Sequence, residues 1–173
     1  SGGTDIIATL DGSEVTFTAP ANFNGSESFT ATVSDGELSD SKSFTVTITA
    51  VNDVPVATTG LSAVTDEDQS IVVSLSGTDI DGDNLTFILG QDAISGSVSI
   101  NGTLATYTPS QDFNGSDSFV FSVSDGEFTD EAEVTLTVNP INDAPVLDAI
   151  DTVYISEDGS ETIILSGSDI DNE

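Results

Sequence analysis

Apolar and polar residues alternate along several short stretches of the chain. The stretches in which every second residue is apolar are 29–33, 44–48, 71–75, 85–89, 119–123 and 134–138. This period of two is typical of β-strands that bury one side and expose the other. Asn-Gly or Asp-Gly pairs at 101–102, 114–115 and 125–126 predict turns beside these strands. No stretch shows the helical period, so the pattern predicts an all-β sandwich with about seven short strands.

The chain also repeats itself. "NFNGSESFTATVSDGELSD" at 22–40 matches "DFNGSDSFVFSVSDGEFTD" at 112–130. "VNDVPV" at 51–56 returns as "INDAPV" at 141–146, and "LSGTDIDGD" at 75–83 returns as "LSGSDIDNE" at 165–173. Each matching pair is separated by about 90 residues, which is the length of one β-sandwich domain. The sequence therefore predicts tandem domains built on one plan.

The repeat predicts three parts. Residues 1–51 would be the carboxy-terminal part of one domain, 52–141 a complete domain, and 142–173 the amino-terminal part of a third. A proline follows each Asn-Asp pair and marks a boundary. Half a sandwich leaves open sheet edges, and two explanations stay open. The chain is a window on a longer tandem array, or 142–173 of one copy completes 1–51 of the next copy and so propagates a filament.

Charge narrows the possible partners. The chain has 31 Asp and Glu residues against one Lys or Arg, for a formal net charge of -30, yet 36% of its residues are hydrophobic and nine are Phe. It therefore has enough apolar residues to fold, and its carboxylates need cations to offset their repulsion. Nucleic acids and anionic membrane surfaces are excluded as partners because they require basic residues. No apolar run reaches the roughly 18 residues needed for membrane insertion.

The absence of Cys and His removes thiolate and imidazole chemistry. We expect no enzyme, because the acidic residues recur at domain ends in both repeats rather than in one cleft. Oxygen ligands remain, and Ca²⁺ takes six to eight of them. In a sandwich with alternating strands, the loop holding Asp79, Asp81 and Asp83 lies at the same end as Asp125. This loop is not an EF-hand, since its sixth and twelfth positions are Asn and Gly.

Several motifs together resemble a known family. "VNDVPV" and "INDAPV" resemble the cadherin interdomain linker, "DIDGDN" the cadherin Asp-x-Asp element, and "VSDGE" the acidic loop before the last strand. Glu67 in "TDEDQS" resembles the acidic residue at the end of the first cadherin strand. The chain is most similar to the bacterial cadherin-like, Ig-like tandem repeats of large secreted RTX-type adhesins. This resemblance implies Greek-key sandwiches, an extracellular or cell-surface location, and Ca²⁺ bound at each interdomain linker.

The expected calcium ligands fall into two joints. The first would hold Asn22, Asn52, Asp53, Asp79, Asp81, Asp83 and Asp125, with Glu157 from a neighbouring repeat or copy. The second would hold Glu67, Asp112, Asn142, Asp143, Asp169 and Asp171, with Asp35 from a neighbouring repeat or copy. When domains stack head to tail, the ligands at the outgoing end of one domain would lie against those at the incoming end of the next.

The expected function is therefore a calcium-rigidified extender of an extracellular adhesin or filament. An alternative is a module that binds a glycan or a protein; against it, the chain has no Trp and two Tyr, and its Phe residues alternate inward. A second alternative is an ice-binding face, suggested by alternating Thr at 45–49 and 135–137. Such rows are also ordinary exposed strand faces.

Overall fold

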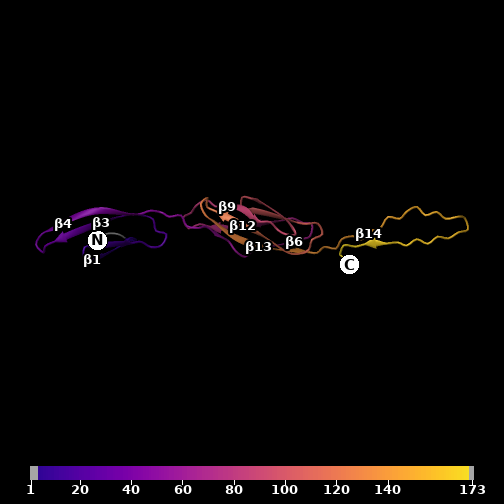
Figure 1. Cartoon of the computed structure of the whole chain (residues 1–173), viewed down its shortest axis with the longest axis horizontal. Helices are drawn as coiled ribbons and strands as arrows, with labels where there is room; N and C mark the ends of the chain where they lie inside the picture. The colour runs from indigo at the N-terminus through magenta and orange to yellow at the C-terminus, as the bar shows by residue number, and fades with distance from the viewer. Residues whose placement is uncertain (1–3, 172–173) are drawn as a thin grey trace.

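A computed structural model describes residues 4–171. Three parts follow one another along a line (Figure 1): β1 to β4, then β5 to β13, then β14 and β15. No helix occurs within these described residues, so none is present there to cross a membrane. The predicted all-β, Ig-like sandwich fold is confirmed. The three residues before this range and the two after it lie outside the description.

The central part forms a complete sandwich of two main sheets. One sheet has the strand order β6-β13-β12-β9, the other has the order β10-β11-β7, and β5 pairs separately with β8. Only β6 and β13 run parallel; the other paired strands are antiparallel. The strands are β5 (Val56–Ala57), β6 (Leu61–Asp66), β7 (Ile71–Ser74), β8 (Gly77–Thr78), β9 (Thr86–Gln91), β10 (Gly96–Asn101), β11 (Leu104–Pro109), β12 (Gly115–Ser124) and β13 (Thr129–Asn139).

Alternation along the strands builds the core of this sandwich. On β13, every second residue from Ala132 to Val138 is buried, and its neighbours are exposed. Phe119, Phe121 and Val123 on β12 join the same cluster, as does Tyr107 from the facing sheet. The β12–β13 turn needs a positive φ at Gly126 (105°), which explains the Asp-Gly pair there.

A hydrogen-bonded pair lies at the edge of this core. The Tyr107 hydroxyl donates to Asp117 Oδ2 at 3.0 Å, and the Asp117 carboxylate also accepts the backbone N–H groups of Ile94 (3.1 Å) and Ser95 (2.9 Å). Burial, together with Asp117, raises the pKa of Tyr107 well above its ordinary value. Asp117 therefore holds the loop before β10 against the core.

Replacing Asp117 by alanine is expected to lower the free energy of unfolding by about 1–3 kcal/mol. The substitution removes the acceptor of the Ile94 and Ser95 N–H groups and leaves the buried Tyr107 hydroxyl only its longer contact with the Ser95 carbonyl oxygen, at 3.4 Å. Urea denaturation measures the change, with Glu133→Ala on the exposed side of β13 as the matched loss of a carboxylate. Equal effects from the two substitutions would contradict this role.

The first part consists of two hairpins. They are β1 (Ile7–Asp11) with β2 (Glu14–Thr18), and β3 (Gly25–Ser34) with β4 (Ser39–Ile48). Their registers repeat those of β10-β11 and β12-β13 in the central sandwich. The Phe17 ring packs edge-on against Phe29, with centroids 5.1 Å apart, and against Phe44, at 6.0 Å.

The third part repeats the start of the central domain. β14 (Val146–Leu147) pairs with β15 (Gly167–Ser168) in the register of β5 with β8. Residues 149–166 run out and back without forming a regular strand (Figure 1). The equivalent residues of the central domain do form β6 and β7, each against a neighbouring strand.

Candidate metal centres

The loop after β8 folds around one carboxylate. Asp79 Oδ1 accepts the backbone N–H groups of Asp81 (2.8 Å), Gly82 (3.0 Å) and Asp83 (3.3 Å). Gly82 has a φ of 82°, which suits a residue without a Cβ. Asp79, Asp81 and Asp83 thereby each offer a carboxylate oxygen within 4.8 Å of the other two.

The second oxygen of Asp79 lacks a partner. Asp79 Oδ2 is buried and accepts no hydrogen bond from any residue in the described range. A buried carboxylate oxygen without a donor is costly unless a cation compensates it. This oxygen, together with two more carboxylates close by, fits the oxygen donor set that Ca²⁺ prefers.

The first linker is tied to this loop and to the β12–β13 turn. The Asp53 backbone N–H donates to Asp81 Oδ2 at 2.7 Å, and Asn52 Nδ2 donates to Asp125 Oδ2 at 2.9 Å. Asp125 Oδ1 accepts two backbone N–H groups of its own turn, which lower the pKa of this carboxyl. A hollow of about 200 Å³ beside the linker is lined by Asp53, Asp81 and Asn22, among others. The structure thus brings these predicted residues to one joint.

The second linker assembles the other predicted group. Glu67, Asp143 and Asp171 each offer a carboxylate oxygen within 4.8 Å of the other two. Glu67 is only 4% exposed and accepts the backbone N–H of Ile141. Asp171 accepts the N–H of Asp143, as Asp81 does that of Asp53 at the first linker. Asp169 Oδ1 accepts the N–H of Asp171 at 3.0 Å, and Asp79 does the same for Asp81.

Negative charge is crowded at the second linker. The pKa of Asp143 is raised, first by desolvation and then by the carboxylates of Asp171, Asp112, Glu67 and Asp68. A raised pKa means that these carboxylates disfavour one another when all are ionised. Without a cation, the linker is therefore held against electrostatic repulsion.

Calcium affinity at the second linker is expected to fall as the pH is lowered. Because its pKa is raised, the Asp143 carboxyl binds a proton more tightly in the folded chain than in an unfolded chain. Ca²⁺ must displace that proton in order to bind. In chelator, lowering the pH should instead increase the stability of the linker, because protonation of Asp143 relieves the repulsion between carboxylates. Calorimetric titrations in buffers of different ionisation enthalpy measure the protons released. No increase in proton release between pH 7 and pH 5 would contradict this coupling.

Asn142, Asp35 and Glu157 were also predicted as ligands. Asn142 Nδ2 donates to the backbone oxygen of Asp143 at 2.7 Å rather than to a carboxylate. Asp35 lies in the β3–β4 turn, where it accepts the N–H groups of Glu37 and Leu38, and Glu157 lies in the turn of the third part. Both turns are remote from the linkers (Figure 1), so their role in a joint stays a prediction about neighbouring repeats or copies.

Asp68 is a further acidic residue at the second linker that was not among the predicted ligands. Its Oδ1 accepts the backbone N–H of Asp112 at 3.2 Å, and its charge contributes to the raised pKa of Asp143. Asp68 has a φ of 58°, and its counterpart Asp158 has a φ of 60°. The recurrence of "ED" at 67–68 and 157–158 is the sequence signal that identifies it.

Comparisons with known proteins agree with the fold. A family model described as "Bacterial Ig domain" matches residues 1–49 and 52–137. No curated protein matches the chain. Among solved structures, cadherin domains 1–4 of protocadherin gamma B7 align over 98% of this chain and 49% of theirs, with 15% identity and a TM-score of 0.55. Drosophila N-cadherin EC1-4 aligns over 86% of this chain and 42% of its own, with 17% identity and a TM-score of 0.50.

An endo-fucoidan hydrolase of glycoside hydrolase family 107 aligns over 82% of this chain with 24% identity and a TM-score of 0.41. The chain spans 23% of that hydrolase and less than half of each of the two cadherin structures. The two cadherin matches support the sandwich fold of the chain.

Proposed function

The chain belongs to the Bacterial Ig domain family, and from this premise we propose that it is a calcium-stiffened extender segment of an extracellular adhesin or filament. The observation that carries the proposal is the repetition of one carboxylate arrangement at both linkers. At each linker, an Asp backbone N–H is bound by the second Asp of an Asp-x-Asp loop.

The residues present suit a hard cation. At the first linker, Asp79, Asp81 and Asp83 would hold Ca²⁺, and Asp79 Oδ2 supplies an oxygen that has no donor among residues 4–171. At the second, Glu67, Asp143 and Asp171 would hold it. Bound Ca²⁺ would neutralise the crowded carboxylates.

Stiffness follows from where these ligands lie. Asp53 and Asp143 are linker residues, whereas Glu67 and Asp81 belong to the central domain. One ion bound by both groups would connect the linker to the domain end and restrict bending between successive domains. We infer a mechanical, non-catalytic role, because the carboxylates gather at joints between domains.

Calorimetric titration with CaCl₂ tests this function. We expect saturable binding with a Kd of roughly 10⁻⁴–10⁻³ M, the range of extracellular calcium modules. MgCl₂ serves as the control, since Mg²⁺ demands a tighter octahedral site and should bind more weakly. No Ca²⁺ binding below about 10 mM would contradict the proposal.

Replacing Asp79 by asparagine is expected to weaken calcium binding at the first linker by about 10-fold or more. The amide removes a charge and offers its NH₂ or carbonyl group where a cation needs a carboxylate. Asp92→Asn is the matched control, because Asp92 accepts the N–H groups of Ala93 and Val98 and lies beyond the end of β9 opposite to the Asp79 loop. Equal calcium affinities for the two variants would exclude Asp79 as a ligand.

A further inference from the structure

The first part has an apolar side that nothing covers within residues 4–171. We call the inward-facing side of β1 to β4 the open face; it includes Leu10, Val15, Val33 and Phe44, all exposed. Val33 is 70% exposed, whereas Val123, its counterpart in the central sandwich, is 0% exposed. A hollow of about 530 Å³ lies between the two hairpins and is lined by this face.

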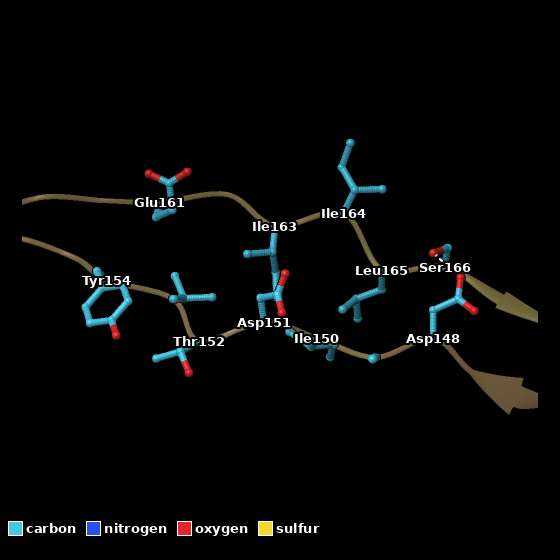
Figure 2. A pocket seen from close by; sticks show the side chains of 12 residues that line it. Asp148, Ile150, Asp151, Thr152, Tyr154, Glu161, Ile163, Ile164, Leu165 and Ser166 are labelled. Carbon is cyan, nitrogen blue, oxygen red and sulfur yellow. Dashed lines mark hydrogen bonds between the residues drawn. The ribbon is translucent and has the colours of Figure 1, made fainter.

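The third part has the complementary feature. We call residues 148–166, which run out and back, the arms. Figure 2 shows Ile163 and Leu165 pointing from one arm towards the other, whereas Ile164 points away. A gap of about 520 Å³ separates the arms. Leu165 is 59% exposed, whereas Leu75, its counterpart in the central sandwich, is 3% exposed.

The central domain shows how two such pieces fit together. Its β6 pairs with β13 in parallel from Leu61↔Val134 to Asp66↔Asn139, and its β7 pairs with β11. Residues 61–75 thus close the sandwich over the hairpins β10-β11 and β12-β13. The arms are the repeat counterpart of the closing segment, and β1 to β4 are the counterpart of the hairpins.

We propose that the arms of one copy close the open face of a second copy, so that the chain assembles head to tail. The two features lie at opposite ends of the molecule with the central domain between them (Figure 1), so one chain cannot pair them internally. Each interface uses two different surfaces at opposite ends of the molecule, and such an interface propagates as an open chain unless the rotation between copies closes a ring. Residues 151–156 would add to β4 in parallel, and 161–164 would add to β2.

Polar residues that join the two pieces of the central domain recur in the outer parts. Ser70 Oγ lies 2.8 Å from Thr108 Oγ1, and Ala57 N donates to Asp130 Oδ2 at 2.9 Å. The counterparts are Ser160 with Thr18, and the backbone of residue 147 with Asp40. The following side chains make no hydrogen bond among residues 4–171 and would gain the central domain's partners on association: Thr18, Glu157, Asp158 and Ser160.

The same docking would complete the first linker. Glu157, from the arms of the first copy, would lie beside Asp53 and Asp81 of the second copy, in the place that Glu67 has at the second linker. Only this consequence rests on the proposed calcium function; the apolar closure does not. Three charged residues stand where the central domain has core residues: Lys42 in place of Ala132, Asp151 in place of Leu61 and Glu161 in place of Ile71. Long charged side chains can cover apolar surface while their heads reach water.

Sedimentation or light scattering of the 173-residue chain over about 1–200 µM tests the proposal. We expect the mass to rise with concentration in steps of 17.7 kDa. Val33→Asp blocks the open face and Leu165→Asp blocks the arms, so each variant alone should remain a monomer. Mixed in equal amounts, they retain one intact face and one intact pair of arms, and should form a 1:1 dimer that does not grow.

Neighbouring outward residues supply the controls. Ser43→Asp on β4, whose counterpart Glu133 is exposed in the central sandwich, and Ile164→Asp on the arms introduce the same charge on the opposite side, and both variants should associate like the parent chain. An unchanged unfolding transition of the central domain shows that each variant is folded. A parent chain that stays monomeric, variants that still associate alone, or a mixture that stays monomeric would each overturn the proposal.

Titrations in CaCl₂ and in chelator separate this proposal from the calcium function. Association in chelator by a chain that binds no Ca²⁺ would support the interface and contradict the proposed function. Calcium binding by a chain that stays monomeric at every concentration would support the proposed function and contradict the interface. The open face would then have another occupant.

Discussion

Glu67→Gln is expected to weaken calcium binding at the second linker by roughly 100-fold, which corresponds to about 2.7 kcal/mol. Glutamine keeps the shape of the side chain and an oxygen for the Ile141 N–H, but removes the charge. Glu67 is buried, and its carboxylate lies among those of Asp143 and Asp171, where water screens charge poorly. Calorimetry should show the loss of one class of sites.

The melting temperature of the same variant is a second test, because the expected effect of the substitution differs between CaCl₂ and chelator. In CaCl₂ the variant should melt below the parent chain, because it lacks the stabilisation by bound ligand. In chelator it should melt at the same temperature or higher, because one carboxylate no longer repels Asp143. Glu133→Gln, which removes an exposed charge from β13, should leave both values unchanged. Lower stability of Glu67→Gln in both conditions would indicate a structural role only.

Phe121→Ala is expected to lower the free energy of unfolding of the central sandwich by about 3–5 kcal/mol. Phe121 is 0% exposed and lies on β12, between β9 and β13, with its ring centroid 6.2 Å from that of Phe87. A loss of this size is a large share of the roughly 5–15 kcal/mol by which a domain is stable.

Denaturant unfolding in excess CaCl₂ measures this change, with Thr135→Ala on the exposed side of β13 as the control. The first part has Ala31 at the equivalent position, so the variant gives the central sandwich the residue that the first part already has. A loss below about 1 kcal/mol would show that Phe121 is not central to the core.

The alternation of apolar residues was sufficient to predict β12 and β13, because a strand with one buried side has a period of two. The repeat counterparts of β6 and β7, at 151–156 and 161–164, do not form strands in the structure, since a strand also needs a partner for its backbone hydrogen bonds. The parallel pairing of β6 with β13 could not be predicted from periodicity, which identifies strands but not their neighbours.

The carboxylate groups were predictable because the repeat showed which acidic residues recur at domain ends. Glu67, Asp143 and Asp171 are far apart in sequence, and the structure brings them within reach of one ion. The hydrogen bond from Asp112 to Asp68 could not be predicted, since it depends on the turn geometry at Asp68. The contribution of Asp35 and Glu157 depends on neighbouring repeats or copies, so it stays a prediction.

Small-angle scattering with and without Ca²⁺ tests the central claim, that bound calcium stiffens the linkers. The Leu165→Asp variant at low concentration keeps the chain monomeric, so that association does not change the apparent length. We expect the maximum dimension to rise on addition of about 5 mM CaCl₂, above the range of extracellular sites, and to fall again with chelator. A scattering profile that is the same in CaCl₂ and in chelator would contradict calcium stiffening.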